Sequence, residues 1–71
     1  MDPREIFELI VKADEALKYA RPDKADVRGR QARDLLERAR NEALAIGNDP
    51  LVAQADQRLA DLATLPPAEP V

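Results

Sequence analysis

The sequence contains no Cys, His, Ser or Trp, and these absences exclude much chemistry. Without Cys it forms no disulfide and offers no thiolate. Without Cys or His, only an oxygen-ligand metal site is possible, and no acidic loop of the calcium-binding kind is visible. Nucleophilic catalysis needs an activated Ser, Cys, Thr or Lys beside a base, and the single Thr, Thr64, falls at the end of a predicted helix. We therefore expect a non-enzymatic protein with no catalytic residues, no cofactor, no metal and no small-molecule substrate.

Long apolar runs and strong positive charge are missing as well. No apolar run approaches the ~20 residues that cross a bilayer, and no signal-peptide pattern opens the sequence. We expect a soluble cytoplasmic protein with no membrane partner. The net charge of −3 argues against a nucleic-acid partner. Residues 21–40 are locally basic, but their arginines scatter around a helix and no aromatic residue accompanies them to stack on bases.

What the sequence does contain favours helices. Its 71 residues suffice for one domain with a modest core. Ala, Leu, Arg, Glu and Asp dominate, whereas β-branched and aromatic residues are scarce. This composition predicts an all-α fold.

The first helix is predicted over about residues 3–21. Asp2 suits the N-cap, Pro3 the first helical position and Glu5 the return bond of a capping box. Pro22 cannot continue the helix. One face carries apolar residues at helical spacing, widened by Phe7: Ile6, Leu9, Ile10, Ala13, Ala16, Leu17 and Ala20.

The second helix is predicted over about residues 24–46, with Asp23 as its N-cap. Its apolar stripe consists of Ala25, Gly29, Ala32, Leu35, Leu36, Ala39, Ala43 and Ile46. A glycine inside a helix costs about 1 kcal/mol relative to alanine. Gly29 is either a tolerated defect or a point of close approach to the first helix, and close approach is the preferred interpretation.

The third helix is predicted over about residues 50–64. Gly47 suits the left-handed position after a helix, and Asp49 and Pro50 repeat the cap-plus-proline start. The inward residues are Leu51, Val52, Ala55, Leu59, Leu62 and Leu65. Residues 66–71 are too rich in proline for a helix and predict a disordered tail.

Both connections are short, so sequential helices should be antiparallel neighbours. The prediction is a three-helix up-down-up bundle, a helical hairpin plus a third helix, in a single domain of residues 1–65.

The segment from Ala39 to Leu62, ARNEALAIGNDPLVAQADQRLADL, resembles tetratricopeptide-like helical repeats, at a scale of about one and a half repeats. A second resemblance, carried by three helices with Ala-rich faces, is to three-helix modules of the microtubule-interacting-and-transport type. Either resemblance implies a protein that holds a peptide or helix of a partner in a groove. The expected groove lies between the first and third helices, against the second.

Four apolar residues fall off the main stripes, namely Val11, Tyr19, Val27 and Leu44. They form either a partner or dimer surface or ordinary edge packing. Two hypotheses follow: a protein–protein interaction module that binds another protein, and a self-associating, homodimeric structural helical protein.

Overall fold

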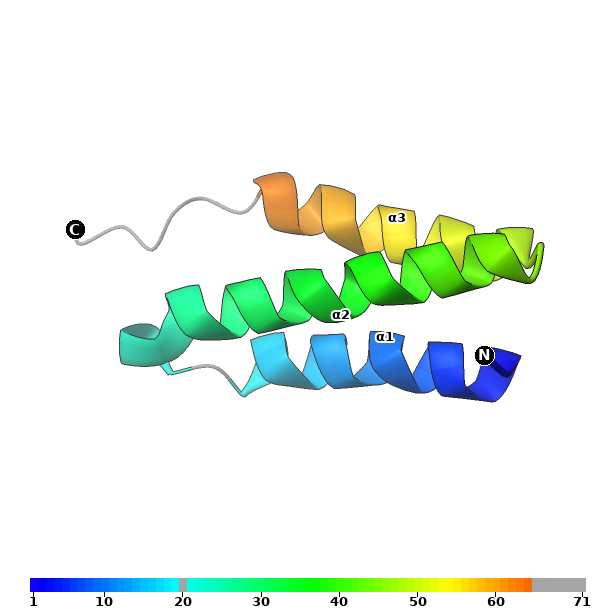
Figure 1. Cartoon of the computed structure of the whole chain (residues 1–71). Helices are drawn as coiled ribbons and strands as arrows, with labels where there is room; N and C mark the ends of the chain where they lie inside the picture. The colour runs from blue at the N-terminus through cyan, green and yellow to red at the C-terminus, as the bar shows by residue number, and fades with distance from the viewer. Residues whose placement is uncertain (20, 65–71) are drawn as a thin grey trace.

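The three-helix up-down-up fold predicted from the sequence is confirmed. The computed structural model describes residues 1–19 and 21–64. Within these residues the elements are α1 (Pro3–Lys18), a short 3-10 turn η1 (Pro22–Lys24), α2 (Ala25–Ala45) and α3 (Asp49–Thr64). Figure 1 shows α2 between α1 and α3, with consecutive helices antiparallel. The predicted tail, residues 66–71, lies outside the described residues, as do Ala20 and Leu65.

The start of α1 is the predicted capping box. The Asp2 side chain accepts a hydrogen bond from the Arg4 backbone N–H at 3.0 Å, and the Asp2 N–H donates to Glu5 Oε1 at 3.2 Å. The helix ends at Lys18, earlier than the predicted residue 21. Arg21 is extended, with φ −80° and ψ 153°, because the ring of Pro22 excludes helical geometry for the preceding residue.

The prediction that Asp23 caps the second helix is wrong. Asp23 lies inside the 3-10 turn, and α2 starts after Lys24 with no side-chain capping bond. The ring of Pro22 presets the first position of that turn, which is closed by a backbone bond from Lys24 N–H to Arg21 O at 2.9 Å. The turn therefore takes the place of a side-chain cap.

The junction between α2 and α3 contains one confirmed prediction and one correction. Gly47 has φ +68°, and two backbone bonds complete a Schellman motif: Asn48 N–H to Ala43 O and Gly47 N–H to Leu44 O. Asp49 is the first residue of α3 rather than its cap. Asn48 is the cap, since its Oδ1 accepts from the Leu51 N–H at 3.2 Å.

The core follows the predicted stripes of all three helices. The buried side chains are Ile6, Leu9, Ile10, Ala13, Ala32, Leu36, Ala39, Ala43, Leu51 and Ala55. Around them pack the half-buried Ala16, Leu17, Leu35, Val52, Leu59 and Leu62. Five of the ten buried residues are alanines, three of them on α2, so the helices pack through small side chains.

Three residues assigned to the apolar stripes behave differently. Phe7 is 47% exposed, because it lies about 100° around α1 from the fully buried Ile6. Ile46 is 40% exposed at the C-cap of α2, after the last helical residue. A Cβ built on Gly29 would meet nothing within 4 Å, so the predicted close approach of α1 is wrong. Gly29 belongs to the first turns of α2, and Figure 1 shows the start of α2 extending past the ends of α1 and α3.

Candidate functional site

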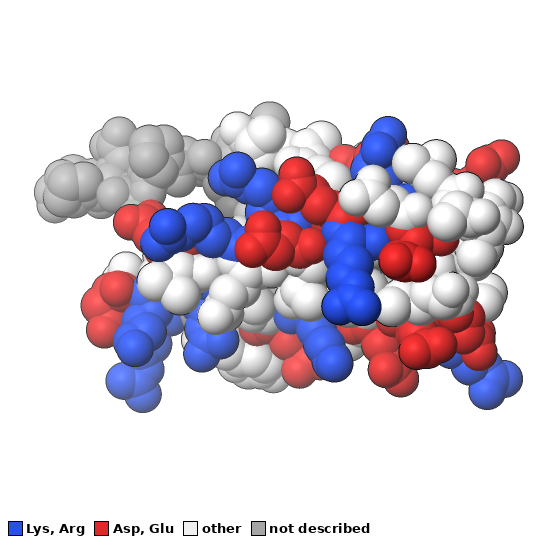
Figure 2. Space-filling model, viewed as in Figure 1, with Lys and Arg blue, Asp and Glu red and all other residues white. Residues whose placement is uncertain are grey.

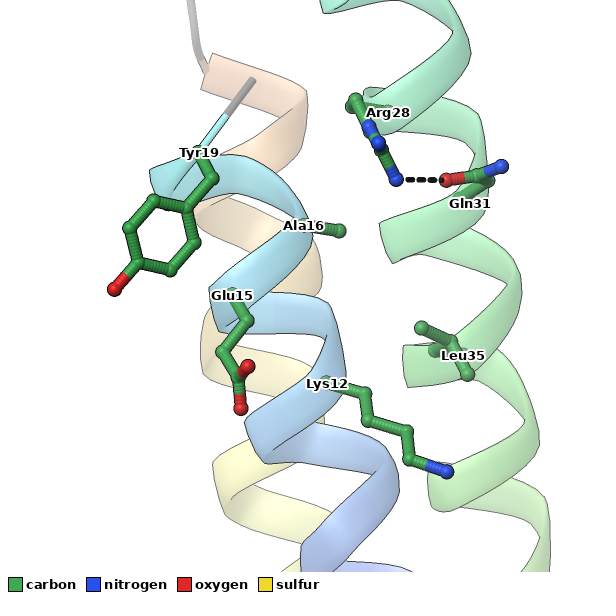
Figure 3. A pocket seen from close by; sticks show the side chains of 7 residues that line it. All are labelled: Lys12, Glu15, Ala16, Tyr19, Arg28, Gln31 and Leu35. Atoms are coloured by element: carbon green, nitrogen blue, oxygen red, sulfur yellow. Dashed lines mark hydrogen bonds between the residues drawn. The ribbon is translucent and has the colours of Figure 1, made fainter.

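A shallow groove of about 370 Å³ lies between α1 and α2, toward the end of the hairpin that contains the connecting turn. Its lining consists of Lys12, Glu15, Ala16, Tyr19, Arg28, Gln31 and Leu35 (Figure 3). Every one of these residues comes from α1, its C-cap or α2. The groove is therefore a property of the helical hairpin.

Helical periodicity explains why these residues share one surface. On α1 the lining positions are three or four residues apart, and the same holds for Arg28, Gln31 and Leu35 on α2. Residues at this spacing lie one above the other on a helix. Because the two helices are antiparallel, the last turns of α1 face the first turns of α2.

The groove has an apolar floor and polar edges. Ala16 and Leu35 are half-buried and pack against the core. In Figure 3 Lys12 reaches from α1 toward α2, and the Arg28 guanidinium donates to Gln31 Oε1 at 3.2 Å. Glu15 lies along the outer edge of α1 in the same view. An apolar side chain could rest on this floor while polar groups of a ligand meet the edges.

Tyr19 is the most exposed aromatic residue of the described chain, at 70%. It is the C-cap of α1, where the helix ends and the chain turns toward α2. The Lys18 Nζ lies 5.5 Å from the centroid of its ring, within range of a cation–π interaction. In Figure 3 the ring lies on the side of α1 away from α2, so it forms the outer edge of the groove, with the Lys18 cation beside it.

Neither cation of the groove takes part in the ion pairs that join the helices. Arg58 Nε contacts both carboxylate oxygens of Asp14, at 3.0 and 3.1 Å, and Arg40 Nε contacts Asp56 Oδ1. Within the described residues, neither Lys12 nor Arg28 has a carboxylate within ion-pair distance. The inter-helix pairs are thus neutralised, whereas the groove keeps uncompensated positive charge.

The four residues predicted as a partner surface do not form one patch. Tyr19 lines the groove, and Val27, 45% exposed, directly precedes Arg28 without lining it. Leu44, 49% exposed, follows Val27 by seventeen positions, about 25 Å along α2. Val11 is half-buried on α1. Of the four residues, Tyr19 alone lines the groove.

The groove predicted between α1 and α3 stays a prediction. The Asp14–Arg58 pair bridges those two helices, and the groove lined by Ala16 and Leu35 lies between α1 and α2. Sequence reasoning also missed Lys12, Arg28 and Gln31 as lining residues. The available signal was their three- and four-residue spacing from the neighbouring lining positions, Glu15, Ala16 and Leu35.

Among the described residues, no group of three or more acidic side chains is placed to hold a metal ion. None of the helices in this part of the chain combines the length and the apolar character needed to cross a membrane. Figure 2 shows positive and negative side chains interspersed over the viewed face rather than gathered by sign.

Comparison of the chain with protein-family models, with curated proteins and with solved structures finds no match. The resemblance to tetratricopeptide-like repeats and to microtubule-interacting-and-transport modules therefore stays a prediction.

Proposed function

We propose that this protein is a non-enzymatic protein–protein interaction module that binds a peptide or helix of a partner protein in the α1–α2 groove. The observation that carries the proposal is the groove itself, with the half-buried Ala16 and Leu35 as its floor and the exposed Tyr19 at its edge. A cytoplasmic location and a kinship with tetratricopeptide-like units belong to the same proposal.

The physical argument rests on what the groove can recognise. A helix or extended segment binds through a few apolar anchors seated in a groove, and exposed aromatic side chains commonly supply much of the binding energy. The groove is open to solvent, and its volume of about 370 Å³ leaves room for only a few side chains of a ligand. It therefore suits one turn of a helix or a short peptide better than a folded domain.

A display selection with random peptides tests this function. The immobilised chain is compared with the Ala16→Arg variant, in which a long side chain rises from the half-buried floor of the groove. We expect peptides to be enriched on the native chain and lost on Ala16→Arg. The matched control is Ala60→Arg, which adds the same side chain at an exposed position of α3 and should keep the enriched peptides.

Two outcomes contradict the proposal. One is the absence of any enriched peptide. The other is the same set of peptides on the native chain and on Ala16→Arg, which would place binding outside the groove. Circular dichroism of each variant establishes that the helices are intact before the selection is interpreted.

A second candidate function is self-association into a homodimer. It is favoured by the start of α2, which extends past the ends of α1 and α3 in Figure 1 and carries the exposed Val27. A second copy pairing along α2 would cover this residue. The two candidates differ in the mass of the free chain in solution.

A further inference from the structure

We propose that the partner segment held in the α1–α2 groove is acidic, with an apolar side chain resting on Ala16 and Leu35 and carboxylates reaching Lys12 and Arg28. This inference rests on the proposed function and specifies the chemistry of the partner. It follows from the charges that line the groove and from what those charges contact.

The charge of the groove is opposite in sign to that of the whole chain. Lys12 and Arg28 contribute two positive charges to the lining and Glu15 one negative charge, so the lining carries a net charge of +1. The chain as a whole carries −3. Lys18 adds a further cation beside Tyr19 at the edge. A local field of this sign attracts an acidic segment and repels a basic one.

The contacts of the two cations strengthen this argument. Arg28 donates to the neutral Gln31, which leaves its charge uncompensated. Lys12 spans toward α2, and in the described part of the chain no carboxylate lies within ion-pair distance of it. By contrast, Arg40 and Arg58 are already paired with carboxylates of neighbouring helices. An incoming carboxylate can therefore engage Lys12 and Arg28 without breaking an internal pair, as it could the other unpaired cations of the described chain, and these two are the ones that line the groove.

The position of Glu15 adds a directional constraint. Its side chain lies along the outer edge of α1, whereas Lys12 and the Arg28 guanidinium lie toward α2 (Figure 3). Acidic groups of a partner should therefore lie on the α2 side of the bound segment, because a carboxylate at the α1 edge would meet Glu15. The apolar anchor would then point between the helices, onto Ala16 and Leu35.

The test uses three defined helical peptides. The first consists of Ala and Glu around one central Leu, the second carries Gln at each Glu position, and the third carries Lys there. Binding is measured by the anisotropy of a label on each peptide. Tyr19 is the single tyrosine of a chain without Trp, so its intrinsic fluorescence reports binding at the groove when the peptide carries no aromatic residue.

We expect the acidic peptide to bind at least about fivefold more tightly than the Gln peptide at low salt, the preference to fade as salt is added, and the Lys peptide not to bind. Arg28→Gln should remove most of the preference. Arg30→Gln is the matched control: it removes the same charge from the same helix, two residues and about 200° away, and should leave the preference intact.

Equal binding of the acidic and Gln peptides, both lost on Ala16→Arg, overturns the acidic specificity and leaves the proposed function standing. An acidic preference that persists in Arg28→Gln and in a Lys12→Gln variant overturns the assignment to these cations. If none of the three peptides binds, the acidic proposal is overturned, and the display selection decides separately whether the groove binds other peptides. The free chain could instead have a doubled mass, with a Tyr19 fluorescence that changes on dilution. That result would identify a second copy of the chain as the occupant of the groove, and it would overturn both the acidic specificity and the proposed function.

Discussion

At the scale of single residues, the two glycines show how one residue type serves opposite purposes. Gly47 has φ +68°, a backbone conformation in which a Cβ crowds the following carbonyl. Gly29 lies in regular helix with nothing within 4 Å of the position a Cβ would take. Glycine is required at position 47 because the backbone there is left-handed. At position 29 the backbone is helical, and glycine only adds conformational freedom to the unfolded chain.

Replacing each glycine with alanine should therefore change stability in opposite directions. We expect Gly47→Ala to lower the free energy of unfolding by about 1 kcal/mol through left-handed strain. Gly29→Ala should raise it by about 0.5–1 kcal/mol through helix propensity. Urea unfolding followed by circular dichroism measures both. A loss of stability in Gly29→Ala would show that α2 tolerates no side chain there, contrary to the open space around this residue.

At the scale of the elements, the starts of the three helices are built in three ways. α1 begins with a side-chain capping box at Asp2 and Glu5. α2 begins after a 3-10 turn with no side-chain cap, and α3 begins after Asn48, whose side chain accepts from Leu51 N–H. The same pattern of an aspartate beside a proline precedes or opens all three, so the pattern alone does not identify the capping residue.

Alanine substitutions at two of these starts test which residue caps. Asn48→Ala should lower the free energy of unfolding by about 1 kcal/mol, because the Leu51 N–H loses its acceptor. Asp23→Ala is the comparison, and its effect should stay within about 0.5 kcal/mol, since Asp23 makes no capping bond. Thermal melts of the two variants beside the native chain provide the measurement. A larger loss for Asp23→Ala than for Asn48→Ala would reverse the assignment.

At the scale of the whole molecule, α2 is the helix against which both α1 and α3 pack. Its 21 residues give a helix about 32 Å long, against about 24 Å for the 16 residues of α1 and of α3. The alanine-rich stripe of α2 supplies four of the ten buried core residues. Asp14–Arg58 ties α1 to α3, and Arg40–Asp56 ties α2 to α3, each an exposed pair worth about 0.2–1 kcal/mol. We therefore expect the burial of apolar side chains along α2 to contribute more to the free energy of unfolding than these two ion pairs do.

The solution mass of the free chain distinguishes the two candidate functions. We expect a monomer of 7.9 kDa across a range of concentrations, because the large exposed apolar residues are spread from Met1 to Ile46 and charges of both signs are interspersed over the face shown in Figure 2. Light scattering on a sizing column makes the measurement. A mass of twice this value that persists on dilution would favour the homodimer, and a Val27→Glu variant should then restore the monomer.

The sequence by itself determined the helices, the antiparallel order and most of the core, because these depend on local periodicity and on proline and glycine at the helix ends. Ile6, Leu36 and Ala55 are buried as predicted, and Gly47 ends α2 as predicted. Tertiary structure decided what depends on the relative position of helices. It left open space around the Cβ position of Gly29, exposed Phe7, and formed a groove between the facing ends of α1 and α2. Periodicity fixes which residues share a face, but only the packing of one helix on another decides which faces meet and which cations stay unpaired.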